Sequence, residues 1–126
     1  MKKWERNKEA FVYCWVNSKN HKMYIGIHCG NRNDGYISSS RYMQADLVKE
    51  PSNFRRVILA EGSYLKMTNL ESLLLLVMDA QNNPNFYNKH NTGGAKLKSK
   101  IKHNEIKISS KTLEKICSKL DAIRTQ

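Results

Sequence analysis

The chain carries the sequence Phe-Val-Tyr-Cys-Trp-Val at residues 11–16 and the sequence Met-Tyr-Ile-Gly-Ile-His at residues 23–28. Both stretches are rich in β-branched and aromatic residues, which is typical of β-strands. The intervening residues 17–22 are all polar and include two asparagines and a serine, which favour a turn. This pattern predicts an antiparallel β-hairpin near the start of the chain.

A loop, a short helix and a third strand are predicted after the hairpin. Residues 29–35 contain two glycines and three Asn or Asp residues, a composition typical of a loop. The serines at 38–40 offer N-caps for a helix over residues 41–49, which Pro51 would end, and a strand is expected at residues 54–60. Four side chains of this helix are expected to face the core, namely Tyr42, Ala45, Leu47 and Val48.

The second half of the chain predicts helices. Thr68 and Glu71 have the spacing of a capping box ahead of the apolar residues 73–78, so a largely buried helix is expected to begin near Thr68. Residues 82–85, Asn-Asn-Pro-Asn, would end it. A basic helix is predicted over residues 95–107.

A last helix is predicted with Ser109 or Ser110 as its N-cap. Its apolar side chains recur near the helical period, at Leu113, Ile116, Cys117, Leu120 and Ile123. The whole order is β-β-α-β-α with a basic C-terminal helical extension, which predicts an α+β fold. A small three-stranded antiparallel sheet is expected to be flanked by helices.

The charge of the chain points to a polyanionic partner. Among 126 residues there are 22 Lys and Arg against 11 Asp and Glu, a formal net charge of +11, and nucleic acid is the common partner of such a field. Residues 89–126 hold ten of the basic and only three of the acidic residues. The alternative is a merely solvated basic face. Five lysines are expected to contact phosphates: Lys89, Lys96, Lys98, Lys100 and Lys102.

Several other classes of protein are disfavoured. No apolar run approaches the roughly 20 residues of a membrane span, and no membrane partner is expected. Residues 1–7 are charged and lead into no signal-type apolar stretch, which favours the cytoplasm. The three cysteines are widely spaced and are expected to be reduced thiols, since His28 beside Cys29 makes a poor zinc site.

Two short motifs carry a family resemblance. Phe11-Val12-Tyr13 precedes Tyr24-Ile25-Gly26 by eleven residues and resembles the paired motifs of the GIY-YIG nuclease superfamily. Other motifs follow in the order seen in its phage-encoded, homing-endonuclease-like branch, namely His28, residues 34–36, 38–41, Glu71 and 87–88. The resemblance covers about residues 11–94. It implies a metal-dependent endonuclease of a phage-infected bacterial cell, with a nuclease domain at 1–94 and a DNA-contacting extension at 95–126.

The resemblance implies roles for individual side chains. Tyr13 would activate or orient the attacking water, and Tyr24 would contact the phosphate or its water network. A free phenol has a pKa of about 10 and is a poor base near neutral pH, so a metal or cation would have to lower that pKa. The alternative for both tyrosines is packing. Glu71 would bind one Mg²⁺, or Mn²⁺, unless it only closes the capping box.

The other implied site residues bind phosphate or order the site. Arg41 resembles the arginine that pairs with the scissile phosphate, and Arg32 is the rival candidate. His28 would act as a base or a phosphate ligand, and Asn88 would order the site. The alternative is that each of them is an ordinary exposed or turn residue.

Departures from the family pattern leave other functions open. Residues 11–13 read Phe-Val-Tyr instead of Gly-Ile-Tyr, and a serine replaces the usual glycine in residues 38–41, so an enzyme of reduced activity is one alternative. A catalytically silent DNA-binding protein is one alternative, and a nuclease acting on RNA or branched DNA is another. One active site cuts one strand per event, so a double-strand break would need a homodimer on DNA, rebinding or reorientation.

Overall fold

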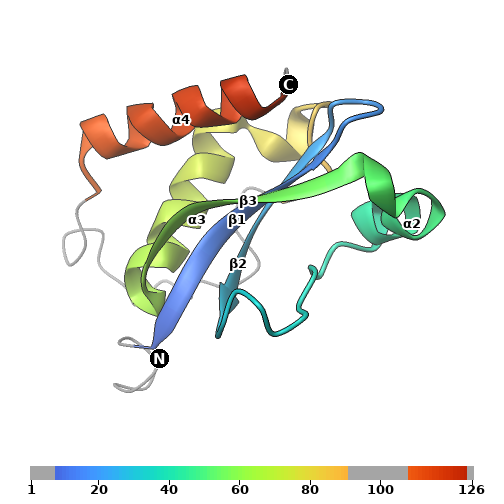
Figure 1. Ribbon diagram of the computed structural model, residues 1–126. Helices are drawn as coiled ribbons and strands as arrows, with labels where there is room; N and C mark the ends of the chain where they lie inside the picture. Colours follow the sequence, from blue (N-terminus) through green and yellow to red (C-terminus); the bar gives the residue numbers. More distant parts are fainter. Residues whose placement is uncertain (1–7, 91–107, 125–126) are drawn as a thin grey trace.

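The computed structural model describes residues 8–90 and 108–124, which form an α+β fold around one antiparallel sheet (Figure 1). The three strands lie in the order β2-β1-β3, so β1 is central. The elements along the chain are β1 (Glu9–Asn17), β2 (Met23–Cys29), α2 (Arg41–Lys49), the 3-10 helix η1 (Pro51–Asn53), β3 (Phe54–Ser63), α3 (Tyr64–Met78), the 3-10 helix η2 (Ala80–Asn82) and α4 (Ser110–Arg124). The predicted fold class and order of elements are confirmed.

The hairpin of β1 and β2 forms as the sequence predicts. Tyr13 faces Gly26 in the antiparallel register, and a turn joins the strands. In the turn, Asn17 accepts a hydrogen bond from the backbone N–H of Lys19 through its side-chain Oδ1 at 3.0 Å. His21 takes a left-handed conformation there, with φ 62°. The polar turn residues therefore supply the local hydrogen bonds that reverse the chain.

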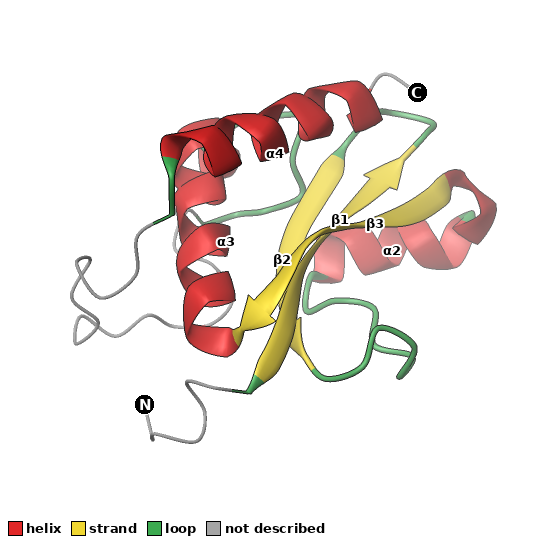
Figure 2. Cartoon of the chain, turned by 60° about the vertical axis from the view of Figure 1, so that its left-hand side comes forward, coloured by secondary structure: helices red, strands yellow, loops and turns green. Residues whose placement is uncertain are grey.

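The two faces of the sheet are covered by different helices. Helices α3 and α4 lie on one side of the sheet and α2 on the other (Figures 1 and 2). Because side chains alternate along a strand, Val12 and Cys14 of β1 point into the core under α3 and α4, whereas Phe11 and Tyr13 join a second cluster with Met43 of α2. The first face carries the main apolar core, and the second is largely aromatic.

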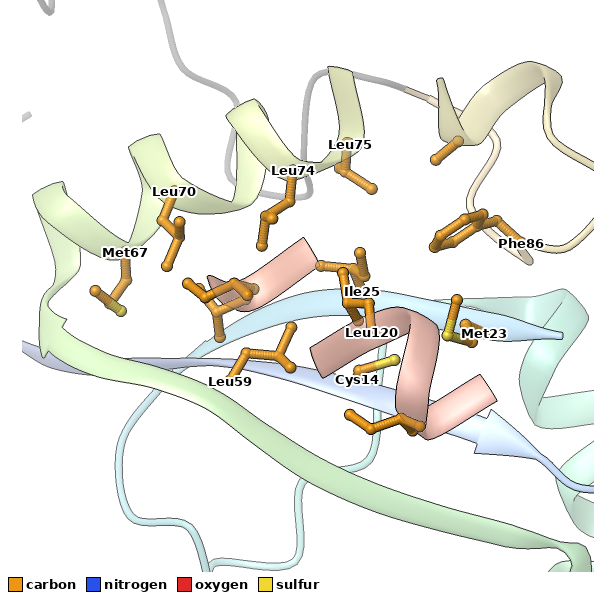
Figure 3. Close-up of a cluster of buried hydrophobic side chains, with 14 of the residues drawn as sticks. Cys14, Met23, Ile25, Leu59, Met67, Leu70, Leu74, Leu75, Phe86 and Leu120 are labelled. Carbon is orange, nitrogen blue, oxygen red and sulfur yellow. The ribbon is translucent and has the colours of Figure 1, made fainter. Parts of the chain in front are cut away.

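Helix α4 is part of the main core. Figure 3 shows Leu120 of α4 beside the core residues of the sheet and of α3. The predicted N-cap is confirmed at Ser109, whose Oγ accepts a hydrogen bond from the N–H of Thr112 at 3.2 Å. Arg55 of β3 also donates from Nη2 to the carbonyl of Ile123 at 2.8 Å. The basic helix predicted at 95–107 lies outside the described residues.

The predicted ends of α3 are wrong. Ser63 caps the helix by accepting a hydrogen bond from the N–H of Lys66, so α3 begins at Tyr64, directly after β3. Thr68 and Glu71 therefore lie inside the helix, and the capping box does not form. Helix α3 also ends before residues 82–85, because Asp79 adopts a left-handed conformation with φ 47°.

The predicted buried face of α2 is also wrong, although its bounds and its cap at Ser40 are confirmed. Tyr42 is 63% exposed and Val48 is 81% exposed, Ala45 is exposed and Leu47 is half-buried. Met43 is fully buried instead. A flexible methionine side chain fills the space above the aromatic cluster, so the helix contacts the sheet through a face other than the predicted one.

Within the described part of the chain, no helix is long and apolar enough to cross a membrane.

Candidate active site at the edge of strand β2

A pocket of about 320 Å³ lies around the edge of β2. Tyr24 and His28 line it from one face of this strand, and Ile27 and Cys29 line it from the other. Because β2 is an edge strand, α3 on one face can place Glu71 next to residues of the opposite face. The pocket brings together four of the residues singled out from the sequence: Tyr13, Tyr24, His28 and Glu71.

Tyr13 reaches this pocket from the central strand across Gly26. The Tyr13 side chain is 1% exposed. A Cβ atom at position 26 would lie within 3.0 Å of the Oη, Cζ and Cε2 atoms of the Tyr13 ring. The glycine therefore leaves room for the phenol to cross β2. The rings of Tyr13 and Tyr24 are 6.3 Å apart between centroids.

The environment keeps the Tyr13 phenol neutral. Burial is the main reason that the pKa of Tyr13 lies well above its ordinary value, and the nearby Tyr24, Tyr36 and Glu71 raise this pKa further. Burial likewise raises the pKa of Tyr24, although a hydrogen bond with Ser39, Oη to Oγ at 3.2 Å, acts in the opposite direction. Tyr13 is therefore a hydrogen-bond donor at neutral pH.

His28 is held from two sides at the pocket. Its Nε2 lies 2.6 Å from Oδ2 of Asp34, and its ring stacks on Tyr36 with the centroids 4.0 Å apart and the planes 3° from parallel. The other carboxylate oxygen of Asp34 accepts a hydrogen bond from the N–H of Tyr36 at 3.0 Å. The hydrogen bond from His28 is the main reason that the pKa of Asp34 lies below its ordinary value.

Sequence reasoning gave no role to Asp34, Tyr36 and Ser39. All three stood in motifs that the family resemblance used, but their contacts to His28, Tyr13 and Tyr24 are not visible in the order of residues. The local signals in this loop were Gly30 and Gly35, which adopt positive φ values of 136° and 86°.

Glu71 is the acidic group of the pocket. It is 1% exposed, although it belongs to the charged residue types that are almost never fully buried without compensating contacts. A single carboxylate fits Mg²⁺, which keeps several of its waters and takes further oxygen ligands from a phosphate. Among the described residues, no group of three or more His, Cys, Asp or Glu could hold a metal ion, so the donor set does not fit a protein-caged metal such as structural zinc.

Arg41 and Asn88 line a neighbouring pocket of about 430 Å³, which shares Tyr24 and Ser39 with the first. Arg41 is exposed at the first residue of α2. The Asn88 side chain is buried and bonds both backbone groups of Ile25, accepting from its N–H at 3.0 Å and donating to its carbonyl at 2.8 Å. Asn88 thus fixes the segment after η2 to strand β2.

Arg32 lies elsewhere. It pairs with Glu61 of β3 and lines a third pocket, of about 710 Å³, which shares no lining residue with the pocket of Tyr13 and Glu71. Arg41 is therefore the better placed of the two arginines. Lys89 lines the pocket of Arg41, whereas Lys96, Lys98, Lys100 and Lys102 lie outside the described residues.

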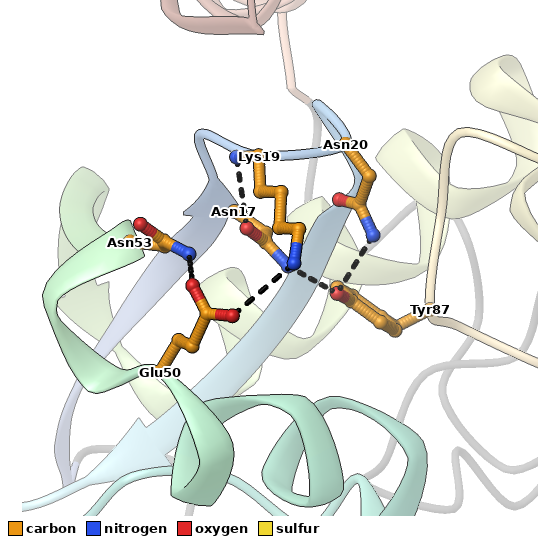
Figure 4. Close-up of polar contacts among 6 residues, drawn as sticks. All are labelled: Asn17, Lys19, Asn20, Glu50, Asn53 and Tyr87. Atoms are coloured by element: carbon orange, nitrogen blue, oxygen red, sulfur yellow. Dashed lines mark hydrogen bonds and ion pairs between the residues drawn. The ribbon is translucent and has the colours of Figure 1, made fainter.

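Tyr87 anchors the segment that carries Asn88. Its hydroxyl accepts a hydrogen bond from Asn17, the last residue of β1, at 3.0 Å and from Asn20 of the hairpin turn at 3.5 Å (Figure 4). The same hydroxyl donates to Oδ2 of Asp46 in α2 at 2.8 Å. Burial is the main reason that the pKa of Tyr87 is raised. One phenol therefore joins the hairpin, α2 and the segment beside the candidate site.

Comparisons of the chain with protein-family models, with curated proteins and with solved structures gave no match.

Proposed function

We propose that this protein is a metal-dependent endonuclease that hydrolyses DNA phosphodiester bonds in the manner of the GIY-YIG superfamily. The observation that supports this is the pocket at the edge of β2. Side chains of three separate elements, Tyr13 of β1, Tyr24 and His28 of β2 and Glu71 of α3, line it together. These are the residue types that the resemblance implies, and no local sequence pattern requires them to meet.

Glu71 is the residue that would hold the divalent ion, Mg²⁺ or Mn²⁺. When bound, such an ion neutralises charge on the phosphate and on the leaving oxygen. The buried position of Glu71 favours this role, because a carboxylate in a low-dielectric pocket attracts a cation more strongly than one in water does.

Tyr13 and His28 have different tasks in the pocket. Tyr13 stays neutral, so it donates a hydrogen bond to a phosphate oxygen or to the attacking water. Asp34 and Tyr36 hold the His28 ring in place, and imidazole is a common general base in enzymes. His28 is therefore the group suited to take a proton from water as the water attacks phosphorus and the bond to the leaving oxygen breaks.

The substrate would be bound by positive charge next to this pocket. Arg41 and Lys89 line the adjoining pocket, and the whole chain carries a net charge of +11. A guanidinium pairs with two phosphate oxygens at once, so Arg41 would orient the scissile phosphate.

Conversion of supercoiled plasmid to nicked or linear DNA tests the proposal. The parent is compared in Mg²⁺, Mn²⁺ and EDTA with Glu71→Gln and Tyr13→Phe, and with Glu50→Gln as a control. Glu50 is exposed and pairs with Lys19 outside the pocket. We expect metal-dependent cleavage in the parent and the control, and a loss of about 100-fold or more in the two pocket variants.

Circular dichroism must first show that all four proteins are equally folded. The proposal is wrong if the folded parent binds DNA but cuts no plasmid, branched DNA or RNA in Mg²⁺ or in Mn²⁺. In that case the protein is a catalytically silent DNA-binding protein. Equal cleavage by Glu71→Gln and the parent would remove Glu71 from the reaction.

A further inference from the structure

The pocket beside the candidate active site has the chemistry of a nucleotide-binding site. It shares Tyr24 and Ser39 with the pocket of Tyr13 and Glu71, so a ligand bound there touches the wall of the candidate site. Its described lining includes the cationic residues Arg41 and Lys89 and no Asp or Glu. Its charge therefore favours a phosphate, and its volume of about 430 Å³ falls within the range of small-ligand pockets.

Tyr42 adds an aromatic surface to this pocket. Its side chain is 63% exposed on α2, so its ring is not used in the core. The Nζ atom of Lys89 lies over one face of the Tyr42 ring, 4.8 Å from its centre, so a base would stack on the opposite face. An exposed ring next to a cation is the combination on which proteins stack unpaired bases while they neutralise the neighbouring phosphate.

The elements that carry this surface are fixed in place. Ser40 caps the first turn of α2 by accepting a hydrogen bond from the N–H of Met43 at 3.2 Å. Asn88, next to Lys89, is held by the two hydrogen bonds to Ile25. The backbone segments that carry Tyr42 and Lys89 are thus held by hydrogen bonds before any ligand binds, which lowers the entropic cost of binding.

We propose that this pocket binds one unpaired nucleotide of a DNA strand beside the scissile phosphate, with its base on Tyr42 and its phosphate on Lys89, while Arg41 holds the scissile phosphate. In a duplex each base is covered by its neighbours, so only an unpaired base offers its face to a tyrosine ring. The substrates that fit are overhangs, flaps and branched DNA with a single-stranded arm. The inference rests on the proposed function only for the location of the scissile phosphate.

Binding in EDTA tests the inference without cleavage. A labelled duplex with a single-stranded flap and a blunt duplex of the same sequence are titrated with the parent, Tyr42→Ala, Tyr42→Phe and the control Val48→Ala, and fluorescence anisotropy is measured. Val48 is exposed on the same helix and does not line the pocket.

We expect the parent to prefer the flap and Tyr42→Ala to lose about tenfold or more in affinity for the flap alone. Tyr42→Phe keeps the ring and should bind like the parent, as should Val48→Ala. Equal losses by Tyr42→Ala on both DNAs, or no loss on either, would overturn the inference.

Cleavage of the same DNAs in Mg²⁺ separates this inference from the proposed function. If the Tyr42-dependent preference for the flap is present but no DNA is cut, the nuclease proposal fails and the nucleotide site stands. If the DNAs are cut and Tyr42→Ala binds and cuts them as the parent does, the nucleotide site fails and the nuclease proposal stands.

Discussion

The phenol ring of Tyr13 lies against Gly26, its partner in the neighbouring strand, and crosses β2 where that strand has no side chain. This contact carries the hydroxyl of a central-strand residue to the outer edge of the sheet, where Glu71 and His28 line the same pocket. The geometry of the candidate site therefore depends on a glycine at position 26 of β2.

Gly26→Ala is expected to disturb both the fold and the site. The added methyl group would meet the rigid Tyr13 ring, so we expect a loss of about 1–3 kcal/mol in the free energy of unfolding, measured with urea. Gly62→Ala in β3 is the control, because the nearest atom to its new methyl group is the flexible end of Met67. Equal losses for both variants would contradict the proposed contact.

Stability should fall at alkaline pH because of Tyr13. In the unfolded chain a phenol ionises near pH 10, whereas burial holds the pKa of Tyr13 higher in the folded protein. The contribution of Tyr13 to the free energy of unfolding is therefore fully present below pH 10. It is lost as the pH rises further, by about 1.4 kcal/mol per pH unit. The free energy of unfolding is measured with urea between pH 9 and 11, an interval that brackets the ordinary phenol pKa. It should decline less steeply with pH in Tyr13→Phe than in the parent. The same slope in both proteins would count against a buried phenol.

Asp34 should titrate below its ordinary range in the folded protein. The hydrogen bond from His28 lowers its pKa, so its contribution to stability is present above the ordinary pKa and disappears as the pH falls. Carbon NMR of the carboxyl group in the parent and in His28→Phe measures this. The phenylalanine can still stack on Tyr36 but donates no hydrogen bond, so the pKa of Asp34 should move up toward its ordinary value. An unchanged pKa would exclude His28 as the cause.

Tyr87→Phe should loosen the junction between the hairpin, α2 and the segment of Asn88. The hydroxyl accepts a hydrogen bond from Asn17 and donates one to Asp46, so its removal leaves both side chains without this partner. We expect a loss of about 1–3 kcal/mol in the free energy of unfolding. Tyr42→Phe, at an exposed position, should change it by less than about 0.5 kcal/mol. If the two substitutions have the same effect, the hydroxyl of Tyr87 is not a structural link.

Local features of the fold could be predicted because short-range physics decides them. The hairpin needs only two apolar stretches and a polar turn, and α2 needs only Ser40 and Pro51 to set its limits. The cap of α3 was harder to predict, because Ser63 and Thr68 both offer a hydroxyl. The helix begins at the earlier residue, where β3 ends, and this removes Glu71 from any capping role.

The candidate site was predicted as a set of residues but not as an arrangement. The order of motifs indicated Tyr13, Tyr24, His28 and Glu71, and these line one pocket. The choice between Arg41 and Arg32 depended on which loop approaches Tyr24, and the partners of His28 depended on how residues 30–40 fold back. Contacts between distant segments set both, so no local pattern contained them.

The sequence by itself determined the α+β class, the hairpin, the extent of α2 and the strong positive charge, because each follows from nearest neighbours or from composition. Only the tertiary structure decided that Glu71 is buried inside α3, that Tyr13 crosses Gly26, and that Tyr42 lies exposed beside Lys89. The physical reason is that burial and contact between elements depend on how the sheet edge and the helices pack together, and packing is a property of the whole chain.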